Sequence, residues 1–307
     1  MPSIADTVTE TIQWVFPEHA GAPGQIHGGR MMQWITQAGT MAAARVARGT
    51  VLLGAMDDID FLHPVKVGEI AILRARVEYI GTSSLEVGVR VWAENVDTGE
   101  RAVTLNSHLV FVSVDAHERP RPVGVRIEPR DAAEAARVKD VDTAANEEFQ
   151  WRFESARSVL PEDALFGNMM FPGKMLMELD EAGGILSMRY CKGLVMTACL
   201  DAMDFYTPIY THEVLTFKAG LNHVGSSSLE VGVKVLAEQP WSGEVRHACT
   251  AYLTYVHLGG DLRPQACRPF TPRTEGERRR WQGALVRRER RLDRVKRLKA
   301  ALSNERG

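Results

Sequence analysis

The stretch Tyr79-Ile-Gly-Thr-Ser-Ser-Leu-Glu-Val-Gly-Val-Arg-Val-Trp-Ala-Glu94 returns 144 positions later as His223-Val-Gly-Ser-Ser-Ser-Leu-Glu-Val-Gly-Val-Lys-Val-Leu-Ala-Glu238. Eleven of the sixteen positions are identical. The same offset pairs Phe16-Pro17-Glu18 with Leu160-Pro161-Glu162 and needs no gap. Self-similarity at one fixed offset is typical of a duplicated structural unit. The chain is therefore predicted to contain two copies of one domain.

In each copy, a stretch typical of a long helix precedes the strands. The first helix is expected to open at Gln25-Ile-His-Gly-Gly29, because a run rich in Met, Ala and Gln follows without a proline. Gly49 is predicted to end this helix, since glycine readily adopts the left-handed conformation found at helix ends. The second helix is expected to begin at Phe171-Pro-Gly173, at the same offset.

The residues that follow each helix alternate as half-buried strands do. From Leu85 to Val91 every second residue is aliphatic, which is the period of a strand with one buried face. Short turns such as Asp97-Thr-Gly-Glu100 leave no room for a parallel crossover, so the sheet is predicted to be antiparallel. One helix and one antiparallel sheet bury each other best when the sheet wraps around the helix. The predicted fold class is α+β.

Four segments are predicted along the chain. Residues 8–128 form the first domain, 129–150 a linker helix, 151–272 the second domain and 273–307 a basic C-terminal helix. That last helix carries eleven Lys or Arg between Arg278 and Lys299. Its apolar residues share one side, which predicts an amphipathic docking helix with its arginines in solvent. These residues are Trp281, Leu285, Leu292, Val295 and Leu298.

Composition excludes several classes of partner. A 45% hydrophobic and 25% charged chain of 307 residues is typical of globular proteins, and its net charge of -2 attracts neither nucleic acid nor a membrane surface. The four cysteines have no spacing typical of a metal site or a disulfide scaffold, so no metal is expected. With no signal-like segment at the N-terminus, a cytoplasmic protein is expected.

These features resemble the tandem, or double, hotdog acyl-CoA thioesterases, and in particular the cytosolic (brain-type) acyl-CoA hydrolases. The resemblance rests on His27-Gly28-Gly29, on Phe171-Pro-Gly-Lys-Met-Leu-Met-Glu-Leu-Asp-Glu-Ala-Gly-Gly184 and on the duplication, and it extends from about residue 8 to 295. It implies two hotdog domains, each an antiparallel sheet wrapped around a long central helix. It also implies hydrolysis of acyl-CoA without a cofactor, coenzyme A being part of the substrate. Such chains are expected to form homo-oligomers, as trimers of tandem chains.

The main candidate site residues are Asp180, Gly28 and Gly29. A helix N-terminus offers free N–H groups to a developing oxyanion, and two glycines let a ligand approach that backbone closely. Asp180 lies beside the apolar face of its helix, where a carboxylate needs an explanation. The resemblance implies that it is the catalytic aspartate, as general base or nucleophile. The alternatives are a structural ion pair for Asp180 and a simple loop-to-helix turn for the glycines.

One position departs from the family pattern. Where the family carries a catalytic asparagine in the loop before the first helix, this chain has Gly21, and Gln25 is the nearest amide. Either position is a candidate for holding the water or the thioester. Serines in the turns before two strands are candidate CoA contacts, although serines often only make turns. These serines are Ser83, Ser84, Ser227 and Ser228.

The resemblance implies that each site joins the helix N-terminus of one domain to a mid-helix residue of the other. The second site then pairs Pro172-Gly173 with Thr36, which stands 144 positions before Asp180. Proline has no N–H, and threonine is no base without a partner. The second site is therefore predicted to be degenerate, able to hold CoA but not to turn over.

Two other functions remain open from the sequence. Because Gly21 replaces the family asparagine, the chain could be a non-catalytic acyl-CoA-binding protein. A hotdog hydratase or dehydratase is less favoured, because such enzymes pair an acidic residue with a histidine and no histidine lies on the helix near Asp180.

Overall fold

The computed structural model describes residues 7–21, 24–125 and 150–304. The linker helix predicted over 129–150 lies outside these residues except for its last position. The first half contains β1 (Thr9–Trp14), α1 (Gly28–Ala47), β2 (Val51–Met56), β3 (Ile59–Asp60), β4 (Ile70–Ile80), β5 (Ser84–Glu94) and β6 (Arg101–Ser113). The second half contains β7 (Arg152–Ser158), β8 (Ala164–Phe166), β9 (Met169–Met170), α2 (Pro172–Cys191), β10 (Leu194–Leu200), β11 (Met203–Asp204), β12 (Val214–Val224), β13 (Ser228–Gln239) and β14 (Glu244–Leu258). The chain continues into α3 (Glu275–Asn304).

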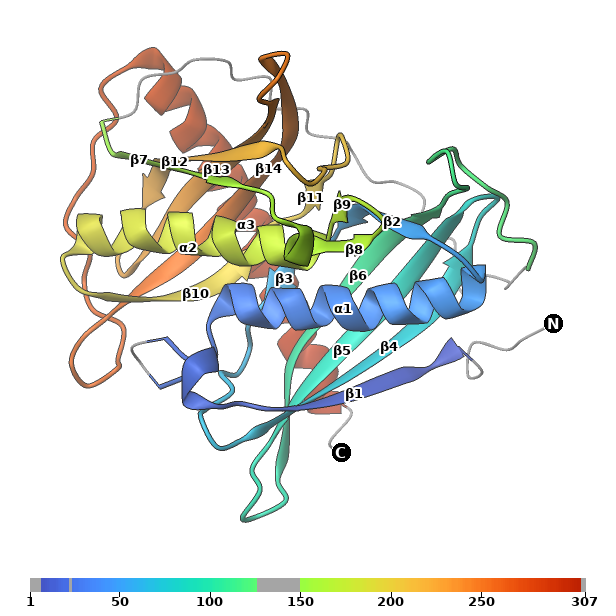
Figure 1. The fold of residues 1–307 in the computed structure, drawn as a ribbon. Coiled ribbons are helices and arrows are strands. Elements are labelled where there is room, and N and C mark those ends of the chain that lie inside the picture. Colours follow the sequence, from blue (N-terminus) through green and yellow to red (C-terminus); the bar gives the residue numbers. More distant parts are fainter. Residues whose placement is uncertain (1–6, 22–23, 126–149, 305–307) are drawn as a thin grey trace.

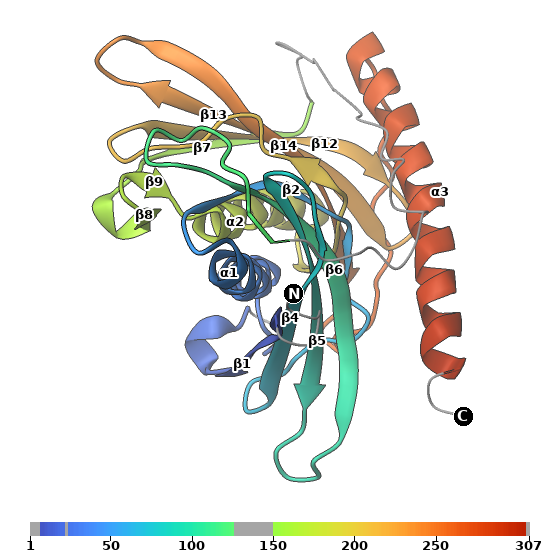
Figure 2. The ribbon, with the colours of Figure 1, turned by 90° about the vertical axis from the view of Figure 1, so that its right-hand side faces the viewer.

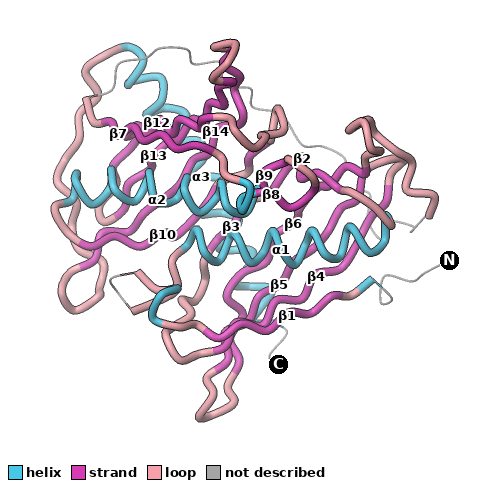
Figure 3. Tube along the Cα trace, viewed as in Figure 1, coloured by secondary structure: helices cyan, strands magenta, loops and turns pink. Residues whose placement is uncertain are grey.

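The two six-stranded antiparallel sheets have the same topology, and each takes its last strand from the other half of the chain. The first sheet has the order β1-β4-β5-β6-β2-β11 and the second β7-β12-β13-β14-β10-β3. The short strand β11 therefore completes the sheet of the first half, and β3 completes that of the second. Each sheet curves around one long helix, as Figures 1 and 3 show. The prediction of an α+β fold with two tandem hotdog domains is confirmed.

The helices α1 and α2 lie side by side between the two sheets (Figure 2). Their N-terminal turns are in close contact, since a Cβ built on Gly29 would lie 2.8 Å from the Cα of Met177. At the related position, a Cβ on Gly173 would lie 3.1 Å from the Cα of Gln33. Only glycine fits such backbone contacts without displacing one helix. None of the helices among the described residues is both long and apolar enough to cross a membrane.

The end of α1 differs from the prediction. The left-handed residue is Arg48, with φ 50°, and not Gly49. The guanidinium of Arg121 donates a hydrogen bond of 2.6 Å to the carbonyl of Ala47, so it satisfies one of the last carbonyls of the helix. A Cβ on Gly49 would lie 2.6 Å from that guanidinium. The absence of a side chain at Gly49 therefore leaves room for this position of the Arg121 guanidinium.

The arginines of α3 were predicted to lie in solvent, and this is correct for Arg278, Arg279, Arg288, Arg290 and Arg297 but wrong for the others. Helix α3 runs along the outer side of both sheets (Figure 2), and three of its arginines pair with buried carboxylates. Arg287 lies 2.7 Å from Glu230, Arg291 3.0 Å from Asp201, and Arg294 2.6 Å from Asp60. By contrast, the predicted docking residues Leu285 and Leu292 are 37% and 55% exposed. The helix therefore docks through charge pairs with carboxylates of both halves and also through the predicted residue Trp281, whose ring stacks on Phe270 with centroids 5.9 Å apart.

A pair on the outer face of the first sheet should make stability depend on pH. His108 lies 3.1 Å from Glu78, which raises the pKa of the histidine and lowers the pKa of Glu78 to about 2. A raised histidine pKa stabilises the fold below its unfolded value, about pH 6.5, and the effect is lost as pH rises through the folded value. His108→Gln is therefore expected to lower the unfolding temperature more at about pH 5.5 than at about pH 8.5. An equal loss at both pH values, in thermal denaturation of both proteins, would contradict this prediction.

Candidate active site

Asp180 of α2 meets the N-terminus of α1. Its Oδ2 accepts a hydrogen bond of 2.7 Å from the backbone N–H of Gly29, which lies 151 residues away in the chain. Its Oδ1 accepts 2.8 Å from the hydroxyl of Thr197 on β10, and the hydroxyl of Tyr255 on β14 is shared between Oδ1 at 3.1 Å and the backbone carbonyl of Asp180 at 2.9 Å. The side chain is fully buried. The carboxylate is thus held by three donors and faces the positive end of the α1 dipole.

The two glycines have different environments. The N–H of Gly29 was expected to bind an oxyanion, but here it is engaged by Asp180 and orients that carboxylate. The N–H of Gly28 has no acceptor among the described residues. A Cβ on Gly28 would lie 2.6 Å from the Cβ of Thr197, so this backbone touches the site directly. Gly28 is therefore the glycine whose N–H is available to a ligand.

A histidine from the other half also reaches Asp180. His27 precedes α1, and its Nδ1 lies 3.3 Å from Oδ2 of Asp180. The His27 side chain is 39% exposed, whereas that of Asp180 is 0% exposed, so His27 stands on the solvent side of the carboxylate. No histidine lies on the helix that carries Asp180, but His27 from the other half places an imidazole beside the carboxylate.

Sequence reasoning missed Thr197 and Tyr255. Their counterparts 144 positions earlier are Leu53 and Phe111, so both differences between the copies add a hydroxyl. This difference between the two halves could have identified Thr197 and Tyr255, because a buried hydroxyl in an apolar strand needs a hydrogen-bond partner. Tyr255 is 1% exposed, and both burial and the nearby Asp180 raise the pKa of its phenol far above the usual value. It therefore stays protonated and remains a hydrogen-bond donor.

Removing the Tyr255 hydroxyl should weaken the site without harming the fold. Tyr255→Phe installs the residue that the first half has at this position, Phe111, which is itself fully buried. One lost hydrogen bond of about 1 kcal/mol would lower kcat up to about tenfold. Steady-state hydrolysis and thermal unfolding of the variant test this together. A variant with lowered stability and unchanged kcat would mean that the hydroxyl only supports packing.

The other predicted site residues lie apart from this cluster. The backbone N–H of Gly21 donates 2.9 Å to the carbonyl of Gln25, and Oε1 of Gln25 is buried without a donor among the described residues. The backbone carbonyls of Ser84 and Ser228 accept hydrogen bonds within their turns, whereas those of Ser83 and Ser227 accept from the N–H groups of Ser113 and His257 on neighbouring strands. No hydrogen bond among the described residues links Gly21, Gln25 or these serines to Asp180. Their roles stay predictions.

The second site has lost its polar groups. Thr36 takes the place of Asp180, and its hydroxyl donates 2.8 Å to the carbonyl of Met32 within α1. Leu53 and Phe111 replace the two hydroxyl donors, and Phe171 replaces His27. Pro172 leaves Gly173 as the nearest N–H at this helix end. Each side chain that contacts Asp180 at the first interface is thus replaced by a different residue at the second.

A cavity of about 260 Å³ lies beside this second interface. Most of its wall is apolar, and it includes Leu53, Phe171 and Pro172 of the second site together with Met170, Met175 and Ile209. The cavity does not include Asp180 or the residues that contact it. Loss of the polar groups has therefore left an apolar space at this interface.

Comparison with known proteins agrees with this geometry. The thioesterase superfamily matches residues 23–100 and 167–242, which make up half of the chain and contain both α1 and α2. The chain belongs to the thioesterase superfamily. Both matched regions contribute to the contact between Asp180 and the N-terminus of α1.

Curated relatives and a solved structure match the chain over between 43% and 87% of its length. The chain is 27% identical over 298 residues to the cytosolic acyl coenzyme A thioester hydrolase of Mus musculus, covering 87% of this chain and 78% of that protein. It is 39% identical over 131 residues to the protein VdlD of Helicobacter pylori, covering 43% of this chain and 75% of VdlD. The solved acyl-ACP thioesterase of Bacteroides thetaiotaomicron aligns with a TM-score of 0.57 at 12% identity, over 83% of this chain and 100% of that one, and this likeness concerns the fold alone. The resemblance inferred from the repeat and its motifs is confirmed.

Proposed function

We propose that this chain is an acyl-CoA hydrolase that converts fatty acyl-CoA and water to a free fatty acid and coenzyme A. The observation that carries the proposal is the contact between Asp180 and the N-terminus of α1, with a hydrogen bond of 2.7 Å from Gly29. The name of the Mus musculus relative, a thioester hydrolase matching 87% of this chain, supports the same reaction. The reaction needs no redox step, and coenzyme A enters as part of the substrate.

The reacting groups follow from the geometry. The thioester carbonyl would accept the N–H of Gly28, where the helix dipole stabilises the negative charge that develops on its oxygen. Asp180 would then take a proton from a water that attacks the carbonyl carbon, and the thiolate of coenzyme A would leave. Alternatively Asp180 would attack that carbon itself, and water would hydrolyse the resulting anhydride after the thiolate has left. Thr197 and Tyr255 orient the carboxylate through hydrogen bonds of 2.8 and 3.1 Å. The second interface, with Thr36 in place of the aspartate, would not turn over.

Steady-state release of free thiol from palmitoyl-CoA tests the proposal. We expect thiol release that saturates with substrate and continues over many turnovers. Saturable binding of palmitoyl-CoA without thiol release would instead favour the acyl-CoA-binding alternative and overturn the hydrolase. Repeating the assay across acyl lengths would then give the chain-length preference.

The contact between His27 and Asp180 keeps a hydratase as the second candidate. His27 and Asp180 lie 3.3 Å apart. A hydratase could use such a pair as general acid and general base to add water to an enoyl-CoA. Loss of the conjugated absorbance of crotonyl-CoA, with no release of thiol, would support that activity. Thiol release from palmitoyl-CoA with unchanged crotonyl-CoA would exclude it.

The chain is proposed to form homo-oligomers in the cytoplasm, as trimers of the tandem unit. In support, the edge strand β1 and the residue pair after it expose Ile12, Trp14 and Phe16 to 59%, 46% and 50%. Alternating apolar residues on an exposed sheet edge are typical of surfaces that another chain covers. Sedimentation velocity of the full chain should give the mass of three chains, and a monomer at micromolar concentration would contradict the assembly.

A further inference from the structure

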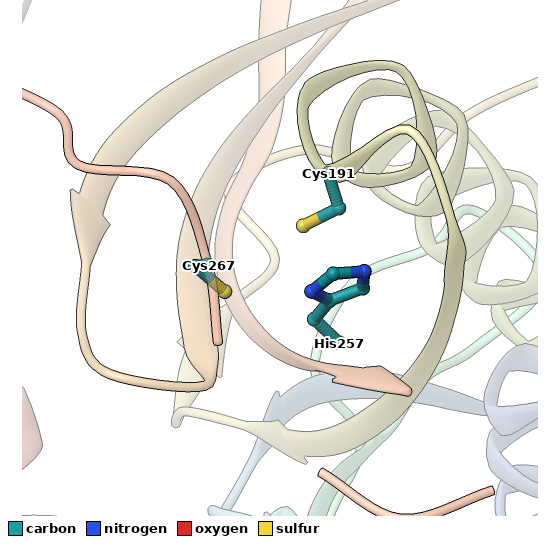
Figure 4. A group of neighbouring side chains, drawn as sticks. All are labelled: Cys191, His257 and Cys267. Atoms are coloured by element: carbon teal, nitrogen blue, oxygen red, sulfur yellow. The ribbon is translucent and has the colours of Figure 1, made fainter. Parts of the chain in front are cut away.

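Three side chains with metal-binding atoms converge from three different elements of the second half. Cys191 is the last residue of α2, His257 lies in β14, and Cys267 lies in the loop that leads to α3. The two sulfurs and a ring nitrogen of His257 lie within 4.8 Å of one another. Figure 4 shows both thiols directed toward the imidazole ring. No other such group is found among the described residues.

We propose that Cys191, His257 and Cys267 bind a thiophilic metal ion, Zn²⁺, with solvent water as the fourth ligand. Two thiolates and one imidazole form a donor set that zinc prefers, and two thiolates balance its charge. Zinc–sulfur bonds of about 2.3 Å place two tetrahedral sulfurs about 3.8 Å apart, so the three atoms need only a small inward rotation. As each bond to sulfur forms, that thiol releases its proton to solvent.

The two ring nitrogens of His257 have different neighbours. Nδ1 lies 3.0 Å from the carbonyl oxygen of Ala266, which can only accept, so Nδ1 carries the proton. Figure 4 shows that Nδ1 is also the ring nitrogen nearer to both thiols. Metal binding through Nδ1 would therefore replace the hydrogen bond to Ala266 and move the ring proton to Nε2. A Cβ on Gly193 would lie 2.7 Å from Nε2, so this glycine packs against the other side of the ring.

Comparison of the two halves argues against ordinary packing as the reason for these residues. The positions 144 residues earlier are Ala47, Ser113 and Val123, and none of them is a good metal ligand. Their backbones are equivalent, since Val123 donates 3.0 Å to the carbonyl of Thr82 as Cys267 donates 2.8 Å to that of Ser226. The fold therefore does not require thiols or imidazole here, yet the second half has all three together. Cys191 and Cys267 are only partly buried, which leaves a path for the ion.

Cobalt titration of the full reduced chain tests the site, because Co²⁺ reports thiolate ligands and tetrahedral geometry by its absorption. We expect thiolate-to-cobalt charge-transfer bands and strong visible bands that saturate at one ion per chain and disappear when Zn²⁺ is added. Zn²⁺ should also raise the unfolding temperature, because it binds only the folded site.

The matched variants take their residues from the first half. The triple variant Cys191→Ala, His257→Ser, Cys267→Val should keep the fold and lose both the bands and the response to Zn²⁺. Cys199→Ala, whose counterpart is Ala55, removes a thiol outside the cluster and should behave as the wild type. If circular dichroism shows that the triple variant is misfolded, the single change Cys267→Val in the loop gives the same test.

Equal bands in the wild type and the triple variant would overturn the proposal, as would the absence of charge-transfer bands in the reduced wild type. A disulfide between Cys191 and Cys267 in protein purified in air, with no cobalt bands after its reduction, would show that the cluster is a thiol pair and not a metal site.

Discussion

Asp180→Asn is expected to lower kcat for acyl-CoA hydrolysis at least ~100-fold with little change in KM. The amide keeps the shape of the side chain but can neither accept a proton nor attack a thioester. The fold should tolerate it, since the amide oxygen can accept from Gly29 while its NH₂ group donates to the hydroxyl oxygens of Thr197 and Tyr255. Steady-state thiol release from palmitoyl-CoA and thermal unfolding measure the two effects.

Thr36→Ala is the matched control, because Thr36 has the same place in the first half. Its hydroxyl bonds only within α1, to the carbonyl of Met32, so its loss should leave most of the activity. If Thr36→Ala were as damaging as Asp180→Asn, the assignment of one working site would be wrong. An Asp180→Asn variant within a fewfold of the wild type would exclude this aspartate as base or nucleophile.

Arg294→Met is expected to reduce the free energy of unfolding by about 3 kcal/mol, the lower end of the cost of breaking a buried ion pair. Arg294 pairs with Asp60 at 2.6 Å and with Asp58 at 2.6 Å, and Asp60 is only 5% exposed. The variant would leave a buried carboxylate without a counter-charge. Methionine preserves helix propensity, so the loss would report the pairing and not the helix. Chemical denaturation followed by tryptophan fluorescence measures it.

Arg297→Met provides the control on the same helix. Arg297 pairs with Asp293, but both side chains are more than half exposed, and such pairs contribute at most about 1 kcal/mol. The double variant Asp60→Asn, Arg294→Met removes the buried charge as well and should recover part of the stability. Equal losses for Arg294→Met and Arg297→Met would show that α3 does not depend on the buried pairs.

Much of the candidate site could be predicted because each position of one half can be compared with the position 144 residues away in the other half. Asp180 stood out as a carboxylate where the first half has Thr36, and Pro172 as a residue without an N–H at the start of the second helix. His27 was misjudged, since its relation to Asp180 depends on how α1 and α2 pack and not on either helix alone. The arginines of α3 were misjudged for the same reason, because their carboxylate partners lie on strands of both halves.

The sequence by itself determined the duplication, the α+β class and the two central helices. These follow from one fixed offset and from periods of 3.6 and 2, which reflect backbone geometry over a few residues. Only the tertiary structure decided which side chains surround Asp180, which carboxylates pair with α3, and that Cys191, His257 and Cys267 meet. Such contacts join residues far apart in the chain, so they depend on strand register and helix packing. No local pattern encodes that arrangement.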